Sequence, residues 1–332
     1  MGEATAETTD PSPEREPEPL SIDVGDPAGL GEPCVFAAWL FAPPVIDRAR
    51  PPPLVVMLPG GTYTKAYHHL VVPGRRGYSA AQYFARRGAV VVALDHLGTG
   101  ESTRPRDGGR VSLEVMAAAN ASCVAILRER LARGDLSAGL PPLPDAFTVG
   151  CGHSLGGYLA QVQQADFGGY DAVAILGATC QAMRGVDDAG RGERELLPAD
   201  EAGYFLMPRR QNHRAFYNPD VPPDVIAADD QSFTALPSGM MDVGLPGRTA
   251  GHAGRITVPV FLAFGSADLL PDPYREPEFY RSSGDVTLYL LPEAGHCHNS
   301  ASTRHLLWRR LGDWGAALAA YSAANATGLK GQ

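Results

Sequence analysis

The segment GCGHSLGG, residues 150–157, is the most informative part of this 332-residue chain. It directly follows an apolar run at 147–149 and precedes a stretch, 155–166, whose apolar residues recur at helical spacing. A serine on a tight strand-to-helix turn takes a strained backbone conformation, so its neighbours two positions away must be small. Gly152 and Gly156 meet that need. The pattern therefore predicts an accessible Ser154 hydroxyl and a Leu155 amide that is free to donate to an oxyanion.

Short apolar runs alternate with helix-like segments on both sides of this turn. Runs without polar alternation are typical of strands buried on both faces, as in a parallel sheet covered by helices. We expect strands at 54–58, 89–94, 147–149, 172–176, 260–264 and 286–291, and an N-terminal antiparallel strand at 34–41. We expect helices at 79–87, 113–133, 155–166 and 306–321. The alternation predicts an α/β fold with a mostly parallel central sheet and helices on both faces.

Two segments interrupt this rhythm. Residues 1–20 hold six acidic residues, one basic residue and four prolines, which predicts a disordered acidic tail. Residues 178–257 are rich in charge, Pro and Gly and contain no strand-like run, so we interpret them as a cap or lid inserted over the sheet. The α/β core then occupies residues 21–177 and 258–332.

Composition excludes several classes of function. The formal net charge is −9, which argues against nucleic acid and membrane-surface partners because both require a concentrated positive field. No apolar run reaches the roughly 18 residues of a membrane span, and the N-terminus lacks a signal-peptide pattern, so we expect a cytoplasmic protein. The five cysteines are widely spaced and form no CxxC pair. They are therefore expected to be reduced thiols, with no disulfide framework and no structural zinc site.

A nucleophilic serine needs a base within hydrogen-bond reach and a third group that orients the base. His296 follows the expected strand at 286–291 and would emerge at the carboxyl edge of the sheet, where open α/β sheets bind ligands. Asp268 follows the strand at 260–264 in the same way. The predicted triad is Ser154, His296 and Asp268. His298 is the alternative base, and Asp272 is the rival acid, with a solvated turn aspartate as its simpler interpretation.

On these motifs the sequence resembles the α/β-hydrolase superfamily over about residues 34–321. The loop LPGGT, residues 58–62, stands where such hydrolases carry a His-Gly oxyanion loop, with Pro59 in place of the usual His. The turn DHLGTGES, residues 95–102, is similar to the family's D-x-x-G-x-G-x-S turn, in which Asp95 is expected to bond to its own turn. The resemblance implies that Gly61 supplies the second oxyanion amide; a plain β-turn is the alternative.

Several neighbours of these motifs have two interpretations. Candidate substrate contacts are Thr62, Tyr63, His153 and Tyr217. Polar surface positions are nevertheless the expectation for Tyr63, Lys65, Tyr67, His68 and His69. A basic cluster that could reach a substrate carboxylate, but is more often solvated, comprises Arg209, Arg210 and His213. Cys151 and Cys297 are expected to be small packing residues.

The resemblance implies a serine hydrolase that cleaves a carboxylic ester, lactone or thioester of a bulky, largely uncharged small molecule. It requires no metal and no organic cofactor, and it leaves the oligomeric state open. A lyase, cyclase or acyl transferase of secondary metabolism could use the same triad, and the Ala-, Arg-, Pro- and Gly-rich composition hints at a bacterial source. A non-catalytic ligand-binding member of the fold is the third alternative.

Overall fold

The computed structural model describes residues 15–47, 50–182 and 196–328. The strands of its large sheet are β1 (Glu18–Gly25), β2 (Cys34–Phe41), β3 (Leu54–Leu58), β4 (Val90–Leu94), β5 (Thr148–His153), β6 (Ala172–Leu176), β10 (Val260–Gly265) and β11 (Val286–Leu291). The helices that pack on it are α1 (Ala80–Arg86), α2 (Leu113–Arg133), α3 (Leu155–Asp166), α6 (Ala250–Ala253) and α7 (Arg304–Gly328).

The large sheet has the order β1-β2-β4-β3-β5-β6-β10-β11. The strands from β4 to β11 run parallel, and β1 and β2 add two antiparallel strands at one edge. The predicted mostly parallel sheet and its N-terminal antiparallel strand are therefore confirmed. Because parallel strands end at the same edge, the turns that follow β5, β10 and β11 gather on one side of the molecule.

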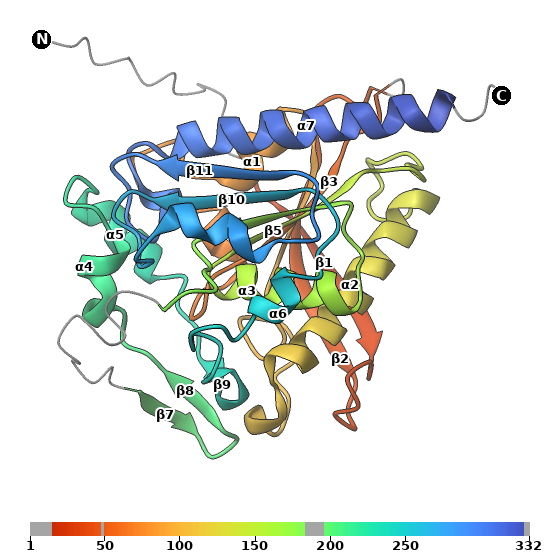
Figure 1. Ribbon diagram of the computed structural model, residues 1–332. Helices are drawn as coiled ribbons and strands as arrows, with labels where there is room; N and C mark the ends of the chain where they lie inside the picture. Colours follow the sequence, from red (N-terminus) through yellow and green to blue (C-terminus); the bar gives the residue numbers. More distant parts are fainter. Residues whose placement is uncertain (1–14, 48–49, 183–195, 329–332) are drawn as a thin grey trace, which may run out of the picture.

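Both faces of the central strands β3, β4, β5, β6 and β10 are buried. In β3, Leu54, Val56 and Leu58 enter the core on one face, whereas Val55 and Met57 enter the core on the other. This follows from the alternation of side chains along a strand and explains the absence of polar residues in the run. Helices α2, α3 and α6 cover the first face, and α1 and α7 cover the second (Figure 1).

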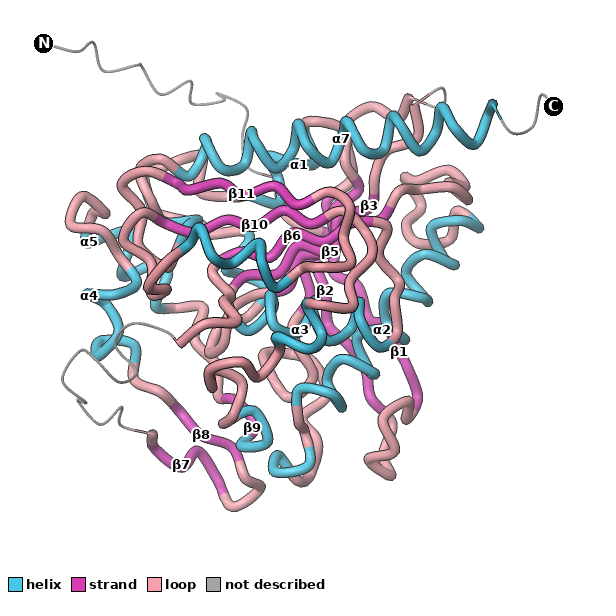
Figure 2. Tube along the Cα trace, viewed as in Figure 1, coloured by secondary structure: helices cyan, strands magenta, loops and turns pink. Residues whose placement is uncertain are grey.

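The chain between β6 and β10 forms a separate small sheet with short helices. Its strands are β7 (Leu197–Asp200), β8 (Tyr204–Leu206) and β9 (Leu236–Pro237), and its helices, besides α6, are α4 (His213–Phe216) and α5 (Pro223–Asp230). The expectation that this segment lacks strands is wrong, although the strands are only two to four residues long. Figure 2 shows β7 and β8 set apart from the strands of the large sheet. Residues 183–195 of the segment lie outside the described residues.

The predicted tail boundary at residue 20 needs a correction. Residues 1–14 lie outside the described part of the chain, but Glu18 already pairs with Leu40, and β1 continues from there to Gly25. Leu20 and Ile22 point into the core with 8% and 1% exposure. Alternation of buried and polar residues therefore outweighs the acidic, proline-rich composition from residue 18 onward.

Truncation at this boundary tests the contribution of β1. A chain that starts at Ser21 loses the paired residues Glu18 to Leu20, whereas a chain that starts at Arg15 keeps them. Burying a leucine side chain stabilises by about 1.5 to 3 kcal/mol, so the shorter chain should have a Tm several degrees lower. Thermal unfolding of the two chains side by side measures the difference. Equal Tm values would show that these residues add nothing.

Candidate active site

Ser154 occupies the turn between the last residue of β5 and the first residue of α3. Its backbone lies at φ 51° and ψ −116°, a conformation that costs a residue with a side chain about 1 to 3 kcal/mol. A Cβ on Gly152 would lie 2.1 Å from the Gly156 carbonyl oxygen, and a Cβ on Gly156 would lie 2.3 Å from that of Leu58. The glycines are therefore needed for the close passage that the sequence predicted.

The loop after β3 lies directly against this turn. The carbonyl of Pro59 accepts hydrogen bonds from the Gly156 amide at 3.0 Å and from Nε2 of His96 at 2.7 Å. A Cβ built on Gly61 would lie 3.6 Å from the Leu155 Cβ, so the two predicted oxyanion residues are neighbours. In the part of the chain that the structure describes, neither the Gly61 amide nor the Leu155 amide donates a hydrogen bond. Both amides can therefore serve an incoming acceptor.

The predicted acid and base form a buried pair. Nδ1 of His296 bonds to Oδ1 of Asp268 at 2.7 Å, and the two residues are 3% and 6% exposed. The carboxylate also accepts from the amides of Gly265 and Leu269. Burial alone would raise the pKa of Asp268, but the attraction of His296 and the hydrogen bonds from imidazole hold it well below its usual value. An ionised Asp268 keeps the proton on Nδ1 of His296, so Nε2 of the neutral imidazole is the nitrogen that can accept a proton.

The alternative base binds the same carboxylate. Nε2 of His298 lies 2.9 Å from Oδ2 of Asp268, while its Nδ1 is buried without a hydrogen-bond partner. The rival acid Asp272 instead accepts from the Tyr274 amide at the start of the 3-10 turn Pro273–Phe279. His296 and His298 therefore both bond to the Asp268 carboxylate. Asp272 takes part in a turn, as its simpler interpretation predicted.

Among the hydrogen bonds of the described residues, none involves the Ser154 hydroxyl. The hydrogen bond between a nucleophile and its base is often long or poorly aligned until a substrate binds. His153 contacts the predicted base, His296. Its Nε2 donates to the His296 carbonyl at 2.7 Å, and the two rings lie 4.8 Å apart. Burial lowers the pKa of His153 well below its usual value, so this imidazole stays neutral.

The four predicted substrate contacts are almost fully buried. Thr62, Tyr63, His153 and Tyr217 are 0%, 2%, 1% and 6% exposed. The hydroxyl groups of Tyr63 and Tyr217 both donate to Oδ2 of Asp229 at 2.6 Å. Thr62 has a left-handed backbone at φ 66°, and its buried hydroxyl has no partner. Contact of these residues with a substrate stays a prediction.

The expected polar surface after the oxyanion loop is wrong. Tyr63, Lys65, Tyr67, His68 and His69 are all buried. The Lys65 ammonium bonds to the buried Asp95 at 2.6 Å and to the exposed Glu101 at 2.5 Å, so its charge is matched by two carboxylates. Asp95 also accepts from the Glu101 amide, which confirms the bond expected within its own turn. A buried lysine with such partners cannot be recognised from the local pattern, because its partners lie 30 and 36 positions away.

Sequence reasoning also missed a buried ion pair beside the oxyanion loop. Arg209 is 6% exposed and lies 3.5 Å from Asp229, which is 1% exposed. The expectation that Arg209 is solvated is therefore wrong. Arg210 is exposed, and His213 bonds to Asp230. Asp229 carries no motif that singles it out in the sequence. Only the fold brings it to Tyr63, 166 positions earlier in the chain.

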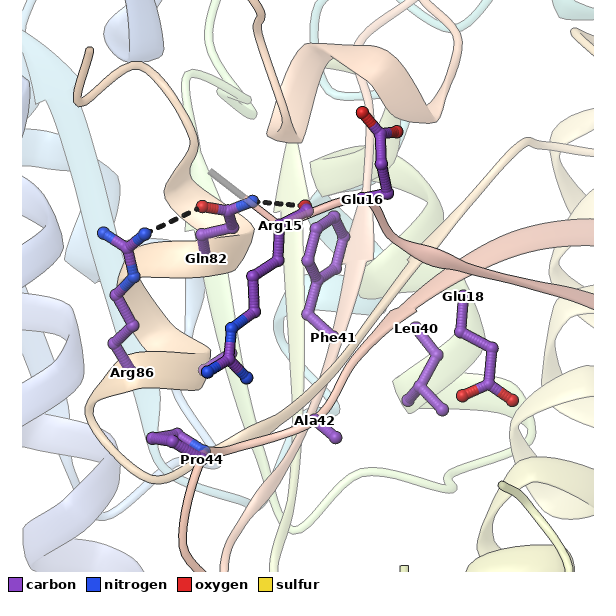
Figure 3. A pocket seen from close by; sticks show the side chains of 10 residues that line it. Arg15, Glu16, Glu18, Leu40, Phe41, Ala42, Pro44, Gln82 and Arg86 are labelled. Carbon is purple, nitrogen blue, oxygen red and sulfur yellow. Dashed lines mark hydrogen bonds between the residues drawn. The ribbon is translucent and has the colours of Figure 1, made fainter. Parts of the chain in front are cut away.

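The described residues contain a hollow of about 610 Å³ away from this site. It is lined by Arg15, Glu16, Glu18, Leu40, Phe41, Ala42, Pro44, Gln82, Ala85 and Arg86, and Gln82 reaches the backbone oxygen of Arg15 (Figure 3). No residue of the predicted triad or oxyanion loop lines it. In the described ranges, no group of three or more His, Cys, Asp or Glu side chains is arranged to hold a metal ion, and no helix is long and apolar enough to cross a membrane.

A sequence model of the Alpha/beta hydrolase family matches residues 55–305. The chain belongs to this family. Solved structures with the same fold include an enol-lactonase from Burkholderia xenovorans LB400, with 14% identity over 84% of this chain and 96% of that one, at a TM-score of 0.58. A proline iminopeptidase from Mycobacterium smegmatis has 15% identity over 92% and 100%, at 0.61. An esterase from Thermogutta terrifontis has 15% identity over 90% and 99%, at 0.56.

These α/β-hydrolase structures differ in the bond that they cleave. At 14–15% identity they establish the fold and not a substrate, since one fold supports many reactions. No curated protein sequence matches the chain. The specific reaction must therefore be argued from the site itself.

Substitution of Gly156 tests the close approach at the turn. Gly156→Ala should destabilise the protein by about 1 to 3 kcal/mol, because its Cβ would overlap the Leu58 carbonyl and force two backbones apart. Gly251→Ala in α6 is the matched control, since nothing lies within 4 Å of its Cβ position. Denaturant unfolding compares the two. A Gly156→Ala protein as stable as the control would contradict the packing described.

Thiol reactivity tests the inert role of the cysteines. All five are buried and unpaired, and burial raises the pKa of Cys151 to about 12 and that of Cys297 well above its usual value. A raised pKa keeps a thiol protonated, so at pH 8 the native protein should show almost no reaction with Ellman's reagent. Five thiols should react after denaturation. A fast-reacting thiol in the native protein would show that one of them is accessible as thiolate.

Proposed function

We propose that the protein is a serine hydrolase that cleaves a carboxylic ester, lactone or thioester through an acyl-enzyme. The observation that carries this proposal is the 2.7 Å bond between Asp268 and Nδ1 of His296, at the same sheet edge as the strained Ser154 turn. This bond selects the imidazole tautomer that a serine nucleophile requires. Two unused backbone amides beside Ser154 support the same reaction class.

In the proposed mechanism, the Ser154 oxygen attacks the substrate carbonyl carbon while Nε2 of His296 takes the hydroxyl proton. The resulting oxyanion accepts hydrogen bonds from the amides of Leu155 and Gly61. When the tetrahedral intermediate collapses, the bond to the leaving group breaks and His296 returns the proton to it. A water molecule then repeats the sequence on the acyl-serine and releases the acid. Asp268 stays ionised and stabilises the imidazolium that forms in each step.

The charges around the site favour an uncharged substrate. The Lys65 ammonium is matched by Asp95 and Glu101, and Arg209 lies against Asp229. A charged substrate group would therefore have to compete with an existing partner in a buried setting, which costs free energy. We propose that residues 178–257 act as the cap that shapes the acyl site, since Tyr217 and Arg209 both come from this segment.

Active-site labelling combined with three substitutions tests the proposal. Ser154→Ala should abolish both fluorophosphonate labelling and hydrolysis of p-nitrophenyl butyrate. His296→Ala should lower kcat at least about 1,000-fold, because the serine loses its general base. His298→Gln should keep kcat within about tenfold, since His298 contacts Asp268 only from the far oxygen.

The same experiment separates the alternatives. Labelling that persists in Ser154→Ala would overturn the assignment of the nucleophile. A large loss in His298→Gln with activity retained in His296→Ala would exchange the two histidines. Product analysis with an added alcohol or amine distinguishes hydrolysis from acyl transfer, because a transferase would give the new ester or amide in place of the acid.

A further inference from the structure

The ion pair of Arg209 and Asp229 has no place in the mechanism above, yet it is buried beside the oxyanion loop. Arg209 opens the 3-10 turn Arg209–Asn212, and Asp229 lies near the end of α5, so both come from the segment between β6 and β10. Burying two charges costs solvation that their attraction only partly returns, so such a pair is weak evidence for a purely stabilising role. Its contacts indicate what else it does.

Arg209, one member of this pair, bonds to the loop at Thr62. This β-branched residue has φ 66°, in the left-handed region that such residues rarely adopt and that persists only when the surroundings hold it. Its carbonyl accepts from the Thr234 amide at 2.9 Å and from Nη2 of Arg209 at 3.4 Å. The strained peptide is thus held by two donors, and both come from the segment between β6 and β10.

The same segment holds the next residues of the loop. The Arg209 guanidinium lies 3.4 Å from the centre of the Tyr63 ring, and the Tyr63 hydroxyl donates to Asp229 at 2.6 Å. The Thr64 amide donates to the Ser232 carbonyl at 2.9 Å. Arg209 therefore packs on the ring face of Tyr63, and Asp229 accepts a hydrogen bond from its hydroxyl. Tyr63 directly follows the strained residue Thr62.

We propose that Arg209 and Asp229 are positioning residues for the oxyanion hole. They hold Thr62 in its left-handed conformation and so keep the preceding Gly61 amide beside Leu155. This inference rests on the proposed function, because it assigns the two residues to the oxyanion site of that reaction. It also means that the Arg209 charge pairs with Asp229 inside the protein and does not bind a substrate carboxylate.

The geometry explains why arginine is needed at this position. Arg209 must reach the Thr62 carbonyl, lie flat on Tyr63 and face Asp229 at once, which a planar guanidinium with several donors can do. A lysine keeps the positive charge opposite Asp229 but has neither the plane nor the second donor branch. Arg209→Lys therefore retains the buried charge balance while it releases Thr62. It is the variant that separates positioning from folding.

The test measures kcat, KM and inhibition by a trifluoromethyl ketone, whose tetrahedral adduct requires the oxyanion hole. Arg209→Lys and Asp229→Asn should lower kcat on p-nitrophenyl butyrate by about 10- to 100-fold, less than the loss of a donor itself, with KM within about twofold. Inhibitor affinity should weaken by the same factor as kcat/KM, because both report on the tetrahedral state. Arg210→Gln, the exposed neighbour, is the control and should match the wild type.

Each other outcome has a defined meaning. Full kcat in a folded Arg209→Lys protein would overturn the positioning role. A raised KM with unchanged kcat, restricted to esters that carry a carboxylate, would show that Arg209 binds substrate and would also overturn it. Failure of the proposed function is seen separately, as a wild-type protein in which Ser154 takes no fluorophosphonate label. A wild type that labels while Arg209→Lys keeps full activity removes only the positioning role.

Discussion

The close approach of α3 to β3 is the contact on which the candidate site depends. The second residue of the helix, Gly156, donates from its amide to the Pro59 carbonyl at 3.0 Å, and this bond joins the serine turn to the loop that carries Gly61. A side chain at Gly156 would push the two backbones apart, because its Cβ would overlap the Leu58 oxygen. This contact brings the Ser154 turn and the Gly61 loop together, so that Leu155 and Gly61, the two proposed oxyanion residues, lie beside each other.

The charge of Asp268 is stabilised by hydrogen-bond donors of the protein and not by solvent. Asp268 is almost fully buried, yet four donors reach its carboxylate: the imidazoles of His296 and His298 and the amides of Gly265 and Leu269. A buried carboxylate with that many donors remains ionised, which explains why its pKa is lowered despite the burial. An acid of this kind orients a neutral base and stabilises its protonated form later, so it suits a site where charge appears only during the reaction.

The sequence alone predicts the position of residues that directly follow a strand. It does not predict contacts between residues that the packing of distant segments brings together. Ser154, Asp268 and His296 each come directly after an apolar run, so the parallel sheet alone predicts that they share an edge. Asp229 has no such marker: it meets Tyr63 only because distant segments pack together. At the N-terminus, acidic residues and prolines masked the alternation that makes Glu18–Gly25 a strand, because its pairing with Cys34–Phe41 is a tertiary contact.

The segment between β6 and β10 contacts both loops that the proposed chemistry uses. On one side, Thr234 and Ser232 bond to the oxyanion loop; on the other, the carbonyls of residues 215 and 216 accept from the amides of His296 and Cys297 at 3.2 and 2.9 Å. A movement that displaced residues 215–216 and 232–234 together would break both sets of bonds at once and so free the proposed base and the proposed oxyanion loop. The described part of this segment is therefore attached to both loops of the candidate site by backbone hydrogen bonds.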